Sequence, residues 1–322
     1  MGGRRHPLII IGDVGLDLVL GPISGWPRVG TETLVERSEL RAGGSAANAA
    51  LAVSYLGGKS QLLSVVGNDE PGAWLAHELH PLQAALIPCS APTTVTVGLI
   101  DSCGERTFFT TRGHLEAFSY ESLRPRIAPA PAANSIALLC GVFLTPALRA
   151  AYPLLIRELQ ALGYAVALDT NWPPQDWSPA LRAEVSGWIG ACDHVLLNDL
   201  EVRSLTDSEE LETAIGRLAP LLKRGATLVV KTGARGALGV QDRERCEQAA
   251  VRTEIFDTIG AGDSFNAGYL LARLDGAGLA AALAAGCATA TSIIARFPRR
   301  SIAAGELGGL RVRLPPALEQ RA

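Results

Sequence analysis

The chain has 322 residues, 48% of them apolar, and a formal net charge of −3. This composition supports a sizeable folded core, and the weak negative charge gives no general attraction to nucleic acid or to an anionic membrane, so neither is expected as a partner. Six cysteines without a Cys-x-x-Cys pair and five histidines without a zinc motif indicate neither a disulfide framework nor a zinc site, and they fit a reducing cytoplasm.

No secretory signal is visible, because Asp13 and Asp17 interrupt the first apolar run. The uncharged segment Leu279–Ala295 consists mostly of small residues. It is too short and too weakly apolar to span a bilayer, which needs about 20 residues. We expect it to be a helix buried between other elements.

Short apolar runs alternate with helix-like segments along most of the chain. The predicted strands are Leu8–Gly12, Gln61–Val66, Ile136–Cys140, Ala165–Asp169, His194–Asn198, Thr227–Lys231 and Val251–Phe256. The predicted helices are Asn48–Leu56, Ala73–Leu82, Leu148–Leu162, Ala180–Ile189, Leu211–Leu222 and Phe265–Leu274. This alternation predicts an α/β fold whose central sheet is mainly parallel and covered by helices on both faces.

Two regions break this rhythm. Asp17–Leu40 and Thr94–Thr111 show the two-residue alternation of strands with no helix between them. In the second region Val95, Val97 and Leu99 share one face. We expect the two regions to pair into a small β-sheet that closes as a lid over a site from which water must be excluded.

The stretch Asp257–Gly268 is the most informative motif of the chain. It opens an apolar helix, and Gly260, Ala261 and Gly262 leave backbone N–H groups uncovered at the helix start, where an anion can bind. Asp263 beside these amides suits a base that takes a proton from a hydroxyl while the anion hole holds a transferring phosphoryl group. Its place at a helix N-terminus is expected to keep Asp263 ionised.

A second glycine motif precedes the first predicted helix. Gly43 and Gly44 would let the backbone approach a ligand closely, while Asn48 offers a donor and an acceptor to hydroxyl groups. The same residues also suit an ordinary glycine turn before a helix. The motif alone leaves both interpretations open.

Two later motifs follow predicted strands. Asn198 and Glu201 lie three residues apart at a helix start, where they would hold waters around Mg²⁺ or simply cap the helix. After Lys231, the glycines Gly233 and Gly236 would let the backbone approach a nucleotide, and they equally suit a β-hairpin. The chain contains no Walker A loop and no Gly-x-Ser-x-Gly elbow.

Taken together, these motifs resemble those of the ribokinase-like carbohydrate kinases, the phosphofructokinase B family, in the same order and over nearly the whole chain. The matching stretches are Gly12–Asp17, Gly43–Asn48, Val66–Gly72, Asn198–Glu201, Lys231–Gly236 and Asp257–Asp263. The last of them matches the family's second signature closely and is the most specific.

The resemblance implies a three-layer α/β/α sandwich that spans residues 1–322 as one kinase domain, with a small β lid formed by segments at about 14–40 and 94–112. It also implies transfer of the γ-phosphoryl group of ATP to a hydroxymethyl group, with Mg²⁺. Asp263 would be the base, and Gly260, Ala261 and Gly262 would form the anion hole.

The resemblance also assigns the binding residues. The substrate would be bound by Asp17, Gly44, Ser45, Asn48, Arg106 and Asn171, and the nucleotide by Asn198, Glu201, Lys231, Gly233 and Gly236. Mg²⁺ would be held indirectly through Asn198 and Glu201.

Two departures from the family's patterns bear on the substrate. Ser45 stands where ribokinases proper have a lysine, so ribose is not secured. Asp169–Trp177 resembles a segment of fructokinases and 2-keto-3-deoxygluconate kinases, but Pro173 replaces its arginine. A sugar acid would need that cation for its carboxylate, so we expect a neutral sugar.

Several members of the family bind potassium beside the anion hole, through the Asp257 region and a C-terminal loop. A monovalent cation would lie near Asp257 and Ile259 here, and the loop would fall at about residues 295–301. That loop lacks the family's usual Gly-Ala, and its arginines would take the place of the cation. The sequence leaves potassium activation open.

Two other functions compete with the sugar kinase. A nucleoside kinase of the same superfamily fits the same motifs, and a catalytically silent sugar sensor would keep the sugar site but has no need of Asp263. Lid sheets in this family often pair between subunits. Because the face of Val95, Val97 and Leu99 needs cover, we expect a homodimer through the lid.

Overall fold

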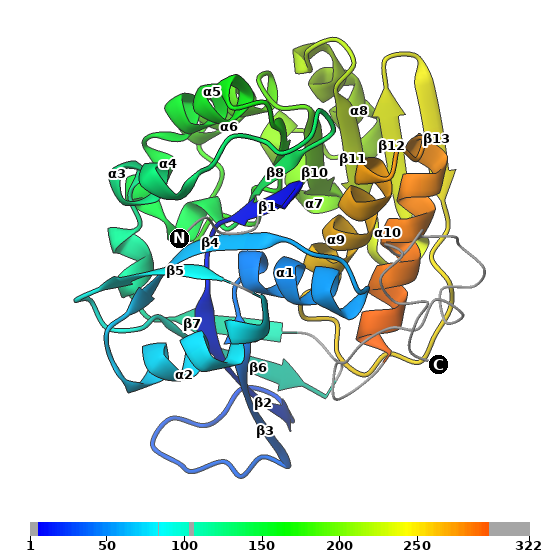
Figure 1. Ribbon diagram of the computed structural model, residues 1–322. Coiled ribbons are helices and arrows are strands. Elements are labelled where there is room, and N and C mark those ends of the chain that lie inside the picture. Colours follow the sequence, from blue (N-terminus) through cyan, green and yellow to red (C-terminus); the bar gives the residue numbers. More distant parts are fainter. Residues whose placement is uncertain (1–5, 83, 103–105, 296–322) are drawn as a thin grey trace, which may run out of the picture.

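A computed structural model of the chain describes residues 6–82, 84–102 and 106–295. At its centre lies a nine-stranded sheet with the order β13-β12-β11-β10-β9-β8-β1-β4-β5 (Figure 1). Its strands are β1 (Leu8–Ile11), β4 (Gln61–Gly67), β5 (Ala85–Cys89), β8 (Ile136–Leu139), β9 (Ala165–Leu168), β10 (His194–Asn198), β11 (Thr227–Lys231), β12 (Ala237–Gln241) and β13 (Glu244–Gln248). Neighbouring strands from β5 to β11 pair in parallel, and β12 and β13 add an antiparallel hairpin at one edge.

Side chains of this sheet alternate between two hydrophobic cores. Leu8 and Ile10 of β1 pack into one core, whereas Ile9 and Ile11 pack into the other. The helices are α1 (Ser45–Tyr55), α2 (Glu70–Glu78), α3 (Tyr120–Leu123), α4 (Pro146–Arg149), α5 (Tyr152–Ala161), α6 (Pro179–Ile189), α7 (Asp199–Thr206), α8 (Leu211–Leu218), α9 (Ala261–Leu274) and α10 (Leu279–Ile294).

Helices α1, α9 and α10 bury their apolar residues in the first core, and α5 to α8 bury theirs in the second (Figure 1). The molecule is therefore a three-layer α/β/α sandwich with a mainly parallel sheet, as predicted.

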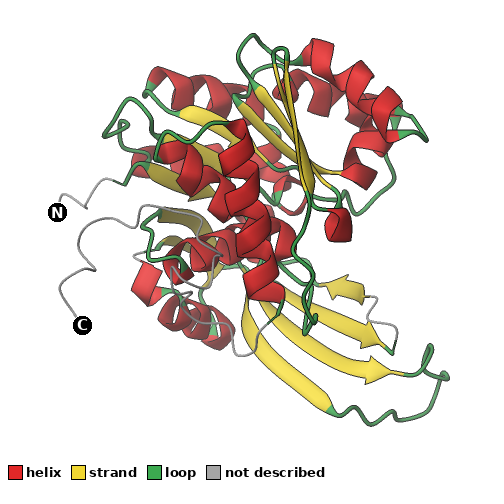
Figure 2. Cartoon of the chain, turned by 90° about the vertical axis from the view of Figure 1, so that its right-hand side faces the viewer, coloured by secondary structure: helices red, strands yellow, loops and turns green. Residues whose placement is uncertain are grey.

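A second, four-stranded sheet extends away from the sandwich (Figure 2). It consists of β2 (Gly15–Ile23), β3 (Arg37–Gly43), β6 (Val95–Asp101) and β7 (Arg106–Thr110), in the order β3-β2-β6-β7. The parallel pairing of β2 with β6 joins the two strand-rich regions as predicted. Residues 24–36 form a loop, so the alternation expected over Asp17–Leu40 gives strands only at its two ends.

Two predicted elements are wrong. Val251–Phe256 is not a strand: the segment follows β13 and pairs with no strand of either sheet in the described residues. Its end is tied to α10 instead, through a hydrogen bond from Phe256 N to Ile294 O of 2.8 Å. The helix predicted over Leu148–Leu162 is two helices, α4 and α5, because Pro153 lacks an N–H and is tolerated only in a first turn.

Candidate active site

The carboxyl ends of the parallel strands gather polar side chains at one edge of the sheet. Asp13 follows β1 and Asp169 follows β9, while Asn198 and Lys231 are the last residues of β10 and β11. Parallel strands place such residues side by side, and ligands of open α/β sheets bind at this edge. Asp13 and Asp169 are almost fully buried, with exposed fractions of 3% and 1%.

The helix α9 begins at the same edge. Gly260 precedes it with φ 75°, a left-handed conformation that glycine adopts without strain. Asp263 lies in the first turn and is buried. Its Oδ2 accepts a hydrogen bond of 3.0 Å from Asn48 Nδ2 of α1. The structure thus brings together the two glycine motifs, which are 215 residues apart in the sequence.

Lys231 faces the middle of this cluster. Its Nζ lies 2.6 Å from Asp169 Oδ2 and donates to Asn266 Oδ1 at 3.3 Å. Asn266 Nδ2 in turn donates to Asp169 Oδ2 at 2.6 Å. A Cβ added to Gly262 would lie 3.5 Å from Lys231 Nζ, so the ammonium group stands beside the proposed anion hole. Four buried carboxyl groups lie around one lysine, so ionisation of all four would leave the cluster with excess negative charge (Asp13, Asp169, Glu201 and Asp263).

The protonation of Asp263 differs from the expectation. Burial, and then the charge of Asp169, raise the pKa of Asp263 to about 8, although Lys231 and the Asn48 hydrogen bond oppose the shift. The helix N-terminus stabilises the ionised carboxylate by about 0.3–1 kcal/mol. Desolvation of a fully buried carboxylate opposes this and raises the pKa by as much as about 3–5. Burial therefore outweighs the helix dipole, and the carboxyl group is ready to hold a proton near neutral pH.

Burial also raises the pKa of two further carboxyl groups in the cluster. Burial raises the pKa of Asp13 to about 6, against hydrogen bonds from the backbone. Burial, and then Asp169, raise the pKa of Glu201 to about 7. The edge of the sheet is therefore a site at which added positive charge is favourable.

Among the expected sugar-binding residues, Asn48 contacts Asp263 directly, and Asp17 lies against the glycine turn that precedes α1. Asp17 is buried on β2, and a Cβ added to Gly43 would stand 2.1 Å from its carboxyl carbon, so any side chain at position 43 would displace the Asp17 carboxyl group. Gly44 has φ 90° and precedes α1, whose first residue is the half-buried Ser45. The tight turn predicted before α1 is present, and it places Asn48 toward Asp263.

The side chains of Asn171 and Arg106 form hydrogen bonds with other residues of the protein. Asn171 has φ 60°, and its Oδ1 accepts a hydrogen bond of 2.7 Å from Gly141 N. It thereby joins the ends of β8 and β9. Arg106 begins β7, is exposed, and donates from Nη1 to Thr258 Oγ1. Both side chains lie near the site without a contact to Asp263.

Asn198 and Glu201 form a capping box at the start of α7. Asn198 Oδ1 accepts from Glu201 N, and Glu201 Oε2 accepts from Asn198 N, both at 2.8 Å. The capping interpretation left open by the sequence is therefore observed. It does not exclude a second role, because Glu201 is buried at the charged edge of the sheet.

The turn after Lys231 is the predicted hairpin. Gly233 has φ 60° and Gly236 φ 108°, and β12 returns antiparallel to β11. A Cβ at Gly236 would stand 1.9 Å from Gln248 O, so this glycine is required by the fold. Lys231 itself contacts Asp169 and Asn266, not this turn.

Besides Asp13 and Asp169, three residues near the site were missed by the sequence analysis. Asn266 lies one turn after Asp263 on the same face of α9, a spacing that could have pointed to it. Arg37 and Arg41 of β3 contact Asp257 from 220 and 216 residues away, respectively. They lie four residues apart, so both are on the same face of β3, but nothing in the sequence indicates which carboxylate they contact.

The sandwich with its second, smaller sheet has the ribokinase fold. The chain matches the pfkB family carbohydrate kinase over residues 10–298, and it belongs to that family. The chain is therefore a carbohydrate kinase, and its family implies the use of ATP.

Known relatives agree with this assignment. A fructokinase of Klebsiella pneumoniae is 31% identical over 250 residues, which cover 74% of this chain and 77% of the relative. A nucleoside kinase of Methanothermobacter thermautotrophicus is 26% identical over 284 residues and 84% of both chains.

Solved structures show the same fold. A probable sugar kinase from Rhizobium etli superposes with a TM-score of 0.79 at 22% identity, covering 95% of this chain and 99% of the other. The ribokinase of Arabidopsis thaliana, solved with ribose and ATP, gives 0.75 at 19% identity and covers 96% of this chain and 99% of the other. In the part of the chain that the structure describes, no helix is long and apolar enough to cross a membrane.

Proposed function

We propose that the protein transfers the γ-phosphoryl group of ATP to a hydroxymethyl group of a small neutral sugar. The observation that carries this proposal is the position of Asp263, buried in the first turn of α9 and hydrogen-bonded to Asn48. A carboxyl group with a raised pKa at a helix start can take the hydroxyl proton while the amides of Gly260, Ala261 and Gly262 stabilise the transferring phosphoryl group.

The sugar would bind between Asp17, Gly44 and Asn48, whose polar groups surround the turn before α1. Ser45 and Asn171 would complete this pocket, and Arg106 would reach it from β7. Pro173, in place of a cation, supports a neutral substrate. The four-stranded sheet would act as the lid that excludes water.

The nucleotide would bind on the side of Asn198, Glu201, Gly233 and Gly236, with Lys231 facing the transferring group. Mg²⁺ fits this edge, because buried carboxylates supply the hard oxygen ligands that it prefers. Among the described residues no group of three His, Cys, Asp or Glu side chains stands ready to hold a metal directly. Asn198 and Glu201 would therefore hold the ion through its waters, and the ion would supply charge that offsets the phosphates.

A nucleoside is the second candidate acceptor. The nucleoside kinase relative covers more of this chain than the fructokinase does. Trp172, 44% exposed and 6.2 Å from the ring of Trp177, follows Asn171 and would offer an aromatic surface to a base. The neutral sugar keeps priority because the fructokinase shows the higher identity.

The cellular compartment and the oligomeric state also belong to this proposal. The described cysteines are free, which supports a reducing compartment such as the cytoplasm. Pairing of two four-stranded sheets would give a homodimer, supported by the half-exposed Phe108 and Phe109 on β7. Light scattering of the purified protein measures this directly.

The test is release of ADP from ATP and Mg²⁺ with a panel of neutral sugars, a sugar acid and nucleosides as acceptors. We expect turnover with a neutral sugar such as fructose or ribose. Turnover confined to a nucleoside would select the second candidate. No ADP release with any acceptor would contradict the proposed function.

A further inference from the structure

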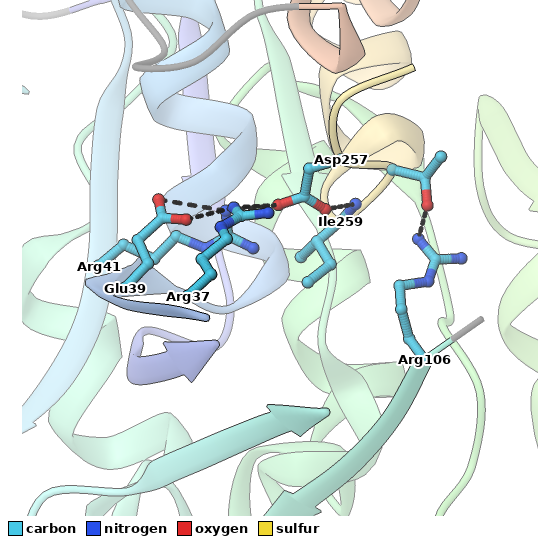
Figure 3. Close-up of polar contacts among 7 residues, drawn as sticks. Arg37, Glu39, Arg41, Arg106, Asp257 and Ile259 are labelled. Atoms are coloured by element: carbon cyan, nitrogen blue, oxygen red, sulfur yellow. Dashed lines mark hydrogen bonds and ion pairs between the residues drawn. The ribbon is translucent and has the colours of Figure 1, made fainter. Parts of the chain in front are cut away.

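The turn that leads into the anion hole is held by both edge strands of the four-stranded sheet (Figure 3). Arg41 of β3 donates from Nη1 to Asp257 Oδ2 at 2.9 Å, and Arg37 Nη2 lies 3.4 Å from the same oxygen. On the other side, Arg106 of β7 donates to Thr258 Oγ1. The four-stranded sheet therefore contacts two consecutive residues, Asp257 and Thr258, shortly before Gly260.

The Asp257 side chain also forms a hydrogen bond within this turn. Its Oδ1 accepts a hydrogen bond of 2.8 Å from Ile259 N, so one carboxylate joins the arginines to the backbone that enters α9 (Figure 3). The Asp257 side chain is 4% exposed. A carboxylate so deeply buried needs a partner of opposite charge.

The two arginines supply that charge in a fixed geometry. Arg37, Glu39 and Arg41 alternate along β3, so their side chains lie on one face of the strand. Glu39 Oε2 lies 2.6 Å from Arg37 Nη2, which holds that guanidinium in place. A guanidinium group stays charged over the whole working pH range and binds a carboxylate with directed N–H groups.

This arrangement does not fit the monovalent cation suggested near Asp257 and Ile259. One carboxylate oxygen already faces two guanidinium groups, and the other is bound to a backbone amide. A potassium ion at this carboxylate would meet the repulsion of both arginines at contact distance. The loop at residues 296–301 that was expected to complete the cation site lies outside the described residues.

We propose that Arg41, supported by Arg37, is a positioning residue that replaces the monovalent cation and couples the four-stranded sheet to the anion hole. Its guanidinium group neutralises Asp257 and so fixes the turn that aims the first amides of α9. Because Arg41 is part of the four-stranded sheet, the anion hole is complete only when this sheet lies against the turn that contains Asp257. This inference rests on the proposed function for its kinetic consequence but not for its structural one.

The first test compares the wild-type protein in potassium, sodium and choline chloride at equal ionic strength. We expect the same turnover and the same melting temperature in all three salts. A potassium-specific rise in either quantity would overturn the replacement of the cation. Melting needs no turnover, so this result stands even where no acceptor is found and the proposed function fails.

The second test removes the guanidinium group. Because a displacement of about 1 Å costs about 100-fold in rate, we expect Arg41→Ala to lower kcat by about 10- to 100-fold with a smaller change in the KM of the sugar. Millimolar guanidinium chloride should restore part of kcat and raise the melting temperature relative to equal sodium chloride. A cavity of about 320 Å³, lined among others by Glu39, Arg41 and Ser264, gives the ion space beside the cluster.

The matched control is Arg112→Ala, which removes an arginine whose ion pair with Glu116 is 89% exposed at the arginine side chain. It should neither lose kcat nor respond to guanidinium. If Arg41→Ala fails to fold, the double variant Arg41→Met with Asp257→Asn leaves no buried charge unpaired. We expect that pair to fold, to turn over slowly and to show no rescue; wild-type kcat in either variant would overturn the proposal.

Discussion

Two buried carboxyl groups flank the proposed anion hole, and their surroundings differ in charge. Asp263 lies among Asp13 and Asp169 with one lysine nearby, and burial raises its pKa to about 8. Asp257, six residues earlier, faces the two guanidinium groups of Arg37 and Arg41. The contrast separates two tasks: Asp263 can gain and lose a proton during turnover, whereas Asp257 is a fixed anchor for the turn.

The largest expected effect comes from removing the proton acceptor. Asp263→Asn keeps the shape of the side chain and a hydrogen-bond partner for Asn48. We expect kcat to fall by about 10²–10⁴-fold, the contribution of a positioned base. Steady-state ADP release measures kcat, and calorimetric titration with the sugar should still detect binding.

The control for this variant is Glu209→Gln, the same change of charge at an exposed position. It should behave as the wild type. A folded Asp263→Asn protein with near wild-type kcat would show that Asp263 is not the base. The proposed difference in role between Asp263 and Asp257 would then be lost.

The next effect concerns the cation of the Asp263 cluster. Lys231→Met leaves Asp169 buried without its ammonium partner, which costs about 3–5 kcal/mol in the free energy of unfolding. Turnover should fall as well, because Lys231 lies beside Gly262. Denaturant unfolding measures the first change and initial rates the second.

A double variant sharpens this result. Asp169→Asn added to Lys231→Met should recover part of the lost free energy of unfolding, because no buried charge is then left unpaired. Strict additivity of the two losses would show that the pair does not interact.

A further expected effect is on stability as a function of pH. The pKa of Asp263 is about 8 in the folded protein against an ordinary value of 3.8, so the folded state holds the proton more tightly. Its contribution is present in full below pH 4 and is lost as the pH rises toward 8. Asp263→Asn should therefore melt higher than the wild type at pH 8, with the difference shrinking toward pH 4. Equal shifts at both pH values would contradict the raised pKa.

Much of this architecture could be predicted from local patterns. The apolar runs at Leu8–Ile11 and Thr227–Lys231 mark parallel strands because both of their faces are buried. The glycines around Gly44 and Gly260 mark turns with positive φ that other residues enter with strain. These features depend on residues that are adjacent in the sequence, so they can be predicted from the sequence alone.

What could not be predicted depends on distant partners. Val251–Phe256 has a strand-like composition but pairs with no strand of the two described sheets. The pKa of Asp263 is set by burial and by Asp169, which the helix position alone does not reveal. The contact of Arg41 with Asp257 spans 216 residues and arises only when the four-stranded sheet is placed beside α9.

The pH dependence of kcat/KM for the sugar tests the central claim most directly, because it reports the groups of the free enzyme. We predict that kcat/KM of the wild-type protein rises from pH 6 and levels off with an apparent pKa near 8, as Asp263 loses its proton. The residual activity of Asp263→Asn should lack this rise. A flat wild-type profile, or the same rise in Asp263→Asn, would contradict the assignment of Asp263 as the base.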